Sequence, residues 1–185
     1  MSPLSARGAN GTADPVVELV VFRVGSEEYV VDVRRVREVV APLPVRRMPR
    51  IPEFLEGVAD LRGEVIPVVD VRRRFGLHAG TPTRKTKLMV VQMAGVPVGL
   101  VVDAVLEVLR VPRSAIRPTP SLAGRDAPGL FLGIVGGLGS ARVGRESRSA
   151  ATGIKFLLNV KALLDPVNPE DMQAAKALAA EAGRQ

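Results

Sequence analysis

The same series of segments occurs twice along the chain, in the same order. Three matched pairs carry this repeat: 36–40 (VREVV) with 105–109 (VLEVL), 54–57 (FLEG) with 130–133 (LFLG), and 67–75 (PVVDVRRRF) with 156–164 (FLLNVKALL). Each copy opens with two runs of β-forming residues around a glycine turn, at 18–31 and at 87–102. A repeat of this size indicates two copies of one structural unit of about 65 residues.

Most of each copy consists of short runs rich in valine and other β-branched residues, which pack well on a pleated surface. Hairpins are therefore predicted at 18–31, 57–69 and 87–102. One segment has a different spacing: its valines fall at 33, 36 and 39 or 40, and Asp32 precedes them as a capping residue. This spacing predicts a short helix over 33–40, so each unit should hold about five strands and a short helix.

Five short strands in an open sheet would leave two unpaired edges, and closure into a barrel removes them. The sequence therefore predicts an all-β fold with two small five-stranded barrels packed side by side. The first barrel is expected at about 16–80 and the second at about 85–165, with some sharing of strands possible. Because so small a barrel buries too little surface to be stable alone, the two are expected to share an apolar seam.

Three segments lie outside the repeat. Residues 1–15 mix Ser, Gly, Pro and Asn without an apolar signal core and are predicted to form a flexible tail. The segment 139–153 has no counterpart in the first copy and has the composition of a loop. Residues 166–185 are predicted to form a C-terminal helix that begins with an Asn-Pro-Glu-Asp cap. Charge-free stretches reach only about 15 residues, too short to span a bilayer, so we predict no direct membrane insertion.

The residue types present exclude several chemistries. The chain has no cysteine and one histidine, His78, which excludes disulfides, thiol nucleophiles and the usual zinc sites. It contains no phosphate-binding P-loop motif, and the glycines of 133–139 do not open a helix. Asp32 and Asp70 each precede a helical segment, where a carboxylate caps backbone N–H groups rather than acting as acid or base. We therefore predict no enzymatic activity, no cofactor and no metal.

The net charge of +7 leaves nucleic acid open as a partner. Arginine-rich stretches at 34–37, 46–50 and 72–74 are candidates for phosphate binding. However, acidic residues are interleaved with them, and aromatic residues, which stack on unpaired bases, make up only 3% of the chain. Solvent-exposed arginines or contacts with acidic protein partners are favoured, and a basic twin-barrel nucleic-acid-binding protein remains the alternative.

Arg62 stands apart from the other arginines. It lies in a glycine-flanked hairpin, at the position where the second copy has Leu138, so the repeat itself does not require a charge there. One interpretation is a turn arginine in water. The other is a charge held for recognition, with Glu38 as its candidate partner, because a bidentate pair between arginine and carboxylate presents an ordered polar face.

Five segments together resemble the CheW family, the coupling proteins of bacterial chemosensory arrays: 19–29, 36–39, 54–63, 66–72 and 98–103. The likeness covers about residues 16–165. It implies a pair of five-stranded SH3-like barrels without catalytic activity. It also implies an adaptor that joins the cytoplasmic tip of chemoreceptors (methyl-accepting chemotaxis proteins) to the CheW-like regulatory domain of the histidine kinase CheA. Such a protein would be cytoplasmic and recruited through receptors to the inner face of the membrane or to cytoplasmic arrays.

In that family the receptor helix lies in the groove between the barrels, and kinase contacts use the barrel ends. The resemblance assigns receptor or kinase interaction to nine residues of this chain: Val36, Glu38, Val39, Gly57, Arg62, Gly99, Val105, Val108 and Leu158. Two departures stand out. Asp60 replaces the usual asparagine before Leu-Arg-Gly, which is expected to change local pairing to Arg62. The 139–153 segment is longer than the usual turn. If the barrel end that carries it meets the kinase, the segment is expected to affect the rings in which adaptor and kinase domains of this family alternate.

Overall fold

The computed structural model describes residues 14–49, 51–78, 80–93, 95–119, 129–136 and 153–164. Within these ranges the chain is almost entirely β-structure, which confirms the predicted all-β class. The strands are β1 (Val16–Val24), β2 (Glu27–Asp32), β3 (Val36–Val40), β4 (Leu55–Leu61), β5 (Glu64–Asp70), β6 (Lys87–Met93), β7 (Val96–Val102), β8 (Ala104–Pro112), β9 (Ile116–Arg117), β10 (Phe131–Val135) and β11 (Lys155–Leu158). Four helical turns accompany them: the 3-10 turns η1 (Val33–Arg35) and η2 (Arg113–Ala115), and α1 (Val71–Arg74) and α2 (Val160–Leu164). The predicted C-terminal helix and nearly all of the predicted tail and 139–153 loop lie outside the described residues.

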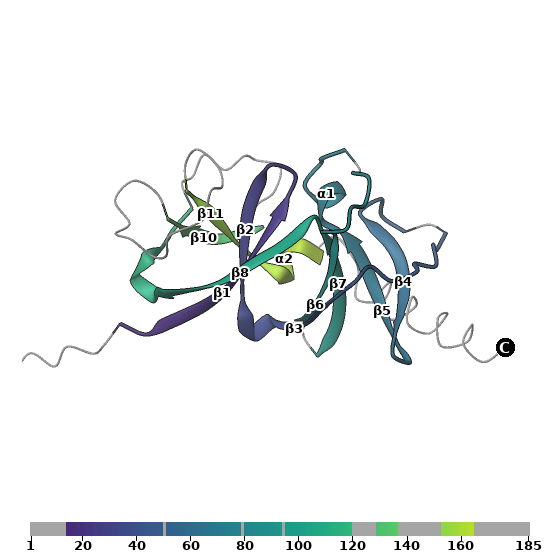
Figure 1. Ribbon diagram of the computed structural model, residues 1–185, viewed down its shortest axis with the longest axis horizontal. Coiled ribbons are helices and arrows are strands. Elements are labelled where there is room, and N and C mark those ends of the chain that lie inside the picture. The colour runs from purple at the N-terminus through teal and green to yellow at the C-terminus, as the bar shows by residue number, and fades with distance from the viewer. Residues whose placement is uncertain are drawn as a thin grey trace, which may run out of the picture.

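The strands form two sheets that lie side by side along the long axis of the molecule (Figure 1). Among the described residues, sheet A has the order β8-β1-β2-β11-β10-β9 and sheet B the order β3-β6-β7-β5-β4. Sheet B has the expected five strands, and sheet A has six because it includes the two-residue β9.

The division expected at residues 80–85 does not separate the two sheets. The first hairpin, β1–β2, pairs with β8 and β11 of the second half, while β6–β7 pairs with β3 and β5 of the first half. The two repeats have thus exchanged their opening hairpins. A repeat in sequence shows which segments are equivalent, but it does not show which copy each segment pairs with.

Both sheets curl toward closure. The edge strands of sheet A, β8 and β9, are joined by η2 alone, so the two edges must lie close together. The backbone of Pro15 and the side chain of Asp14, at the end of the expected tail, bond to Arg113 and Ser114 beside this junction. In sheet B, residues 45–48 contribute a single bridge, in which Arg46 pairs with Val58 of β4. It brings the chain that follows β3 onto the opposite edge of the sheet.

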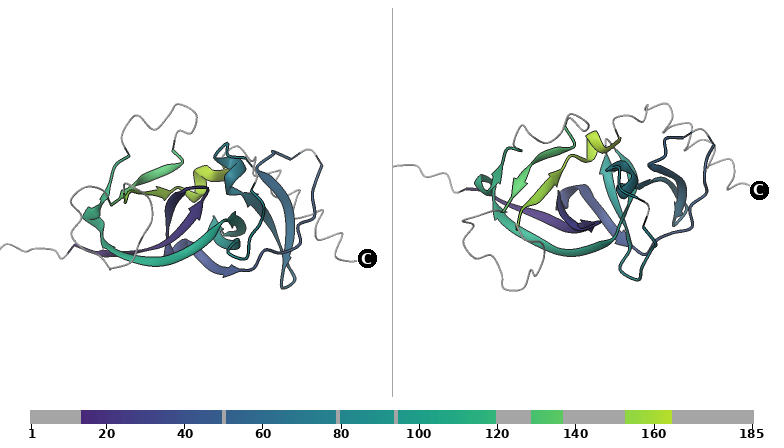
Figure 2. Two further views of the ribbon diagram at one scale, coloured as in Figure 1. Left: turned by 45° about the horizontal axis from the view of Figure 1, so that its top comes forward. Right: turned by 90° about the horizontal axis from the view of Figure 1, so that it is seen from above.

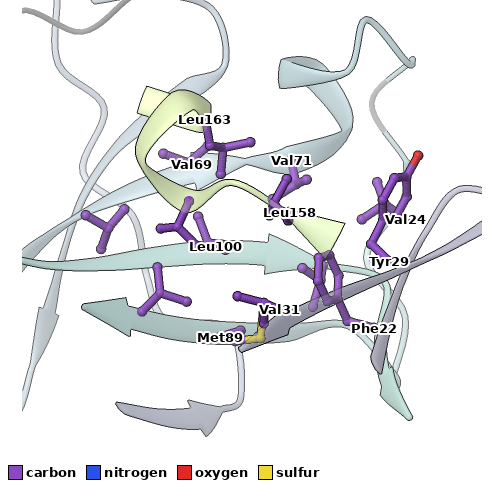
Figure 3. Packing of buried hydrophobic residues seen from close by; sticks show 14 of the residues in the cluster. Phe22, Val24, Tyr29, Val31, Val69, Val71, Met89, Leu100, Leu158 and Leu163 are labelled. Atoms are coloured by element: carbon purple, nitrogen blue, oxygen red, sulfur yellow. The ribbon is translucent and has the colours of Figure 1, made fainter. Parts of the chain in front are cut away.

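Buried residues form three clusters, and neighbouring residues of one strand alternate between them. Leu19, Val21 and Val30 fill the interior of sheet A, whereas Ile66, Val68 and Val90 fill that of sheet B. The largest cluster lies between the sheets and joins Phe22 and Val31 of sheet A to Met89 and Leu100 of sheet B, among others (Figure 3). Because successive side chains point to opposite faces, one face of a strand lines its own barrel and the other lines the shared cluster. This cluster, called the seam below, confirms the predicted shared apolar core.

The prediction of a helix over 33–40 is wrong. Only Val33–Arg35 form a 3-10 turn, whose cap Asp32 accepts the Arg34 N–H at 2.9 Å, and the chain then continues as β3. The register of β3 against β6 shifts between Val36 and Glu38, so Val36 and Val39 both lie opposite seam residues although they are three positions apart. A β-bulge adds one residue to the alternation and so produces the three-residue spacing of valines that a helix would share.

The repeat-related strand β8 contains the same irregularity. Val105 lies opposite Phe22 and Val108 opposite Val20, with a register shift between them, so these valines also share one face. The predicted equivalence of 36–40 and 105–109 is therefore confirmed as a pair of bulged strands. A second equivalence is confirmed after β5 and β11, where Asp70 and Asn159 cap the short helices α1 and α2.

Candidate partner-binding surface

Strands β3 and β8 occupy equivalent edges of the two sheets, and both lie on the same side of the molecule (Figures 1 and 2). Val39 lies opposite Met89, which is fully buried, yet its own side chain is 39% exposed. Val108 lies opposite the buried Val20 and is 54% exposed. The apolar seam thus continues onto the surface along both edge strands.

Val36 and Val105 are partly buried and pack against the seam. With Val39 and Val108 they form a set of four apolar side chains, called the seam-edge valines below. These four predicted residues therefore share a setting at the border between buried core and solvent. Such a border offers apolar area to a partner without requiring the core to open.

Arg62 pairs with Glu38, the partner suggested by the sequence. The Nη2 atom of Arg62 lies 2.9 Å from Oε2 of Glu38, and Nη1 donates to Oε1 at 3.4 Å. The Glu38 side chain is 20% exposed and that of Arg62 is 76% exposed. The carboxylate is thus fixed on β3, and the guanidinium extends outward with most of its surface accessible.

The turn that carries Arg62 has a special backbone. Arg62 has φ 56° and Gly63 has φ 86°, as in the two-residue turns that match the twist of a hairpin. Glycine adopts such angles freely, whereas an arginine there must be held by its surroundings. The N–H of Gly63 donates to Oδ1 of Asp60 at 2.5 Å. Asp60, the departure from the family pattern, therefore braces the turn.

Gly57, Gly99 and Leu158 lie in the interior rather than with the other six predicted residues. A Cβ at Gly57 would lie 2.1 Å from the carbonyl oxygen of Arg46, and one at Gly99 would lie 2.8 Å from Cδ1 of Leu88. Leu158 is 2% exposed within the seam. The structure thus places these three residues where close packing is required, so they can influence a surface only through the packing beneath it.

Asp103 has a structural role that was not predicted from the sequence. Its Oδ2 accepts the N–H of Gly25 in the β1–β2 turn at 2.6 Å, and its Oδ1 accepts Nε of Arg72 on α1 at 2.8 Å. The bond to Asp103 raises the pKa of Arg72. Asp103 lies where the chain passes from β7 of sheet B to β8 of sheet A, so one carboxylate ties both sheets together. Val-Val-Asp ends both opening hairpins, but Asp32 of the first copy caps η1, so the repeat does not show this role.

A buried ion pair was also not predicted from the sequence. Nζ of Lys155 on β11 lies 3.2 Å from Oε2 of Glu28 on β2, and the side chains are 10% and 3% exposed. Arg23 adds a contact of 3.3 Å to the same carboxylate. The pair with Lys155 holds the exchanged hairpin β1–β2 to β11, whereas the Arg23 contact lies within the hairpin.

The aromatic residues are used for packing. Phe22, Tyr29, Phe75, Phe131 and Phe156 contact one another with ring centroids 4.9–6.3 Å apart. Burial raises the pKa of the Tyr29 hydroxyl, with a further contribution from Glu27. Rings packed in this way do not form the open stacking platform that single-stranded nucleic acid requires. The nucleic-acid alternative therefore gains no support from the fold.

No helix in the described part of the chain is long and apolar enough to cross a membrane.

Comparisons with known proteins identify a family whose members are similar to this chain in sequence. The CheW-like domain family model matches residues 18–165. The chemotaxis protein CheW of Rhizobium meliloti is 42% identical over 106 residues, which cover 57% of this chain and 68% of the relative. The protein FrzA of Myxococcus xanthus is 36% identical over 135 residues, covering 73% of this chain and 82% of the relative.

A solved structure shows the same architecture. The crystal structure of the scaffolding protein TtCheW from Thermoanaerobacter tengcongensis superposes with a TM-score of 0.70 at 28% identity. The match covers 85% of this chain and 98% of that one. With the family model spanning most of the chain and the fold shared, the protein belongs to the CheW-like domain family.

Proposed function

We propose that the protein is a non-enzymatic adaptor that couples the cytoplasmic tip of chemoreceptors to the regulatory domain of the histidine kinase CheA. The chemotaxis and scaffolding names of its relatives support this role. The observation that carries the proposal is the continuity between the buried seam and the exposed seam-edge valines, with Glu38 of the edge strand β3 holding Arg62 of the β4–β5 turn. In this role the protein acts in the cytoplasm and reaches the membrane through the receptors.

An amphipathic receptor helix fits this surface. Its apolar stripe would cover the seam-edge valines, in the way that helices dock into apolar surfaces through residues spaced three or four apart. Fully burying a valine side chain contributes about 1.5–3 kcal/mol, and Val39 and Val108 remain 39% and 54% exposed before a partner binds. Arg62 would then orient the helix through polar contacts, because exposed charges contribute more to specificity than to affinity.

The proposed receptor contacts are therefore Val36, Glu38, Val39, Arg62, Val105 and Val108. Gly57, Gly99 and Leu158 would support them from the interior. The kinase regulatory domain would use a separate surface at the barrel ends, so both partners could be bound at once. The protein would act by placing its two partners next to each other, without a chemical step of its own.

A reconstitution tests this proposal. Purified protein is mixed with a receptor cytoplasmic fragment and CheA, and assembly is measured by co-sedimentation. The wild type should form a ternary complex, and Arg62→Glu should abolish or strongly reduce it. Arg84→Glu is a matched control, because it makes the same charge change at an exposed arginine outside the strands. Failure of the wild type to assemble, or equal assembly by Arg62→Glu and Arg84→Glu, would contradict the proposal.

A further inference from the structure

Two neighbouring residues of β3 reach the same turn of sheet B. Nη1 of Arg37 lies 2.6 Å from Oε2 of Glu64, and the Glu38 carboxylate binds Arg62 on the other side of Gly63. In a regular strand, adjacent side chains point to opposite faces and do not reach one short turn together. Here the register shift between Val36 and Glu38 makes Arg37 the extra residue of a bulge. A bulge re-aims the side chains around it.

The two ion pairs hold the turn from both ends. Glu38 holds the side chain of Arg62, and Arg37 holds Glu64, the first residue of β5. The Arg62 backbone has φ 56°, a conformation that persists in a residue with a side chain when the surroundings fix it. β3 and the β4–β5 hairpin meet across the closing edges of sheet B, so these pairs join segments that are not neighbours in the sheet order.

We propose that Arg37 and Glu64 are positioning residues for the partner-binding surface. Their ion pair fixes the β4–β5 turn against β3, so that Arg62 is already oriented before a partner arrives. This inference rests on the proposed adaptor function for the identity of the partner. Its own claim concerns which residues set the geometry of Arg62.

Because the Arg37–Glu64 pair is exposed, its effect on the position of Arg62 can be measured separately from its effect on stability. The side chains of Arg37 and Glu64 are 46% and 40% exposed, and ion pairs in such settings contribute little to global stability. Losing the pair should leave the fold intact while the turn becomes freer to move. A partner would then have to order Arg62 on binding, and that cost lowers affinity.

The first measurement uses the free protein. In nitrogen-15-labelled protein, the chemical shift and relaxation of the Arg62 Nε–Hε signal report on the order of the guanidinium, whose Nη1 and Nη2 atoms contact Glu38. Arg37→Gln and Glu64→Gln should both shift this signal and increase its fast motion, and the charge exchange Arg37→Glu with Glu64→Arg should restore it. Arg34→Gln is the matched control, because Arg34 is also exposed and lies 2.6 Å from its partner Asp32. The inference is overturned if the chemical shift and relaxation of the Arg62 signal change no more in Arg37→Gln and Glu64→Gln than they do in Arg34→Gln.

The second measurement is a binding cycle with the receptor fragment. Arg37→Gln should raise the Kd about three- to tenfold at an unchanged melting temperature, since neighbouring residues commonly couple to this extent. In an Arg62→Ala background the same substitution should have no further effect. An equal loss in both backgrounds would overturn the inference. If the wild type does not bind the fragment at all, the proposed function fails, and the measurement on the free protein still decides the positioning role.

Discussion

Asp103 and Arg72 form an ion pair with Nη2 of Arg72 2.8 Å from Oδ2 of Asp103, at the point where the chain crosses between the two sheets. The same carboxylate accepts the N–H of Gly25, so the pair links the exchanged hairpin β1–β2 to α1. Both side chains are less than one-third exposed. The relative placement of the two barrels thus depends on one carboxylate as well as on the apolar seam.

Asp103→Ala is expected to lower the free energy of unfolding by about 1.5–3 kcal/mol, the usual range for hydrogen bonds to a charged group. Urea denaturation measures this loss. The control is Glu18→Ala, which removes one partner of the more exposed pair with Arg110. That change should cost no more than about 1 kcal/mol. Equal losses in the two variants would contradict the role assigned to Asp103.

Gly57→Ala should be strongly destabilising because the new Cβ would meet the carbonyl oxygen of Arg46. Gly63→Ala is the matched control, since Gly63 also has a positive φ but a Cβ added there would meet nothing within 4 Å. We expect a loss of about 1–2 kcal/mol for Gly63→Ala from backbone strain alone. The Gly57→Ala loss should be larger by about 1–3 kcal/mol because of the steric clash. Thermal or urea unfolding of the two variants gives the comparison, and equal losses would show that the close approach is not rigid.

Val39→Asp and Val108→Asp should each weaken binding of a receptor fragment at least about tenfold, because each places a charge on the apolar surface that the helix would cover. Their effect on stability should be small, since both side chains are already substantially exposed. Isothermal titration measures the binding, and Val16→Asp provides a control at a valine that is 66% exposed at the start of β1. Loss of binding by only one of the two variants would restrict the surface to one barrel.

Asp32 makes the stability depend on pH. The side-chain hydrogen bond from Arg34 is the largest cause of a lowered pKa in Asp32, with smaller contributions from the Arg34 backbone and from nearby arginine charges. A carboxyl whose folded pKa is below its unfolded pKa stabilises the protein above the unfolded value, near pH 4, and loses this contribution as the pH falls through the folded value. Asp32→Asn should therefore show a smaller decrease in free energy of unfolding between pH 6 and pH 3, as judged by urea denaturation.

The control for Asp32→Asn is Arg34→Gln, which keeps the Asp32 carboxyl but removes its side-chain hydrogen bond and should also reduce the decrease. If neither variant reduces the decrease, the Arg34 contact does not persist in solution.

Much of the local structure was predictable because it depends on residues close together in the chain. The hairpins at 18–31, 57–69 and 87–102 and the capping roles of Asp32 and Asp70 follow from turn and cap chemistry, and the structure confirms them. The pairing of Arg62 with Glu38 was also anticipated. The strand character of 36–40 was not, because a bulge gives valines a three-residue spacing that a helix would share.

The sequence alone determined the class of fold and the equivalence of the two repeats, and it proposed the residues on which recognition would depend. Tertiary structure decided which hairpin belongs to which barrel, because pairing between distant strands depends on the long-range burial of their faces and not on the pattern within any one strand. It also separated the nine predicted residues into six at the seam edge and its turn and three in the interior. That separation depends on which surfaces remain uncovered after the two barrels pack, and a linear pattern of residues does not contain this information.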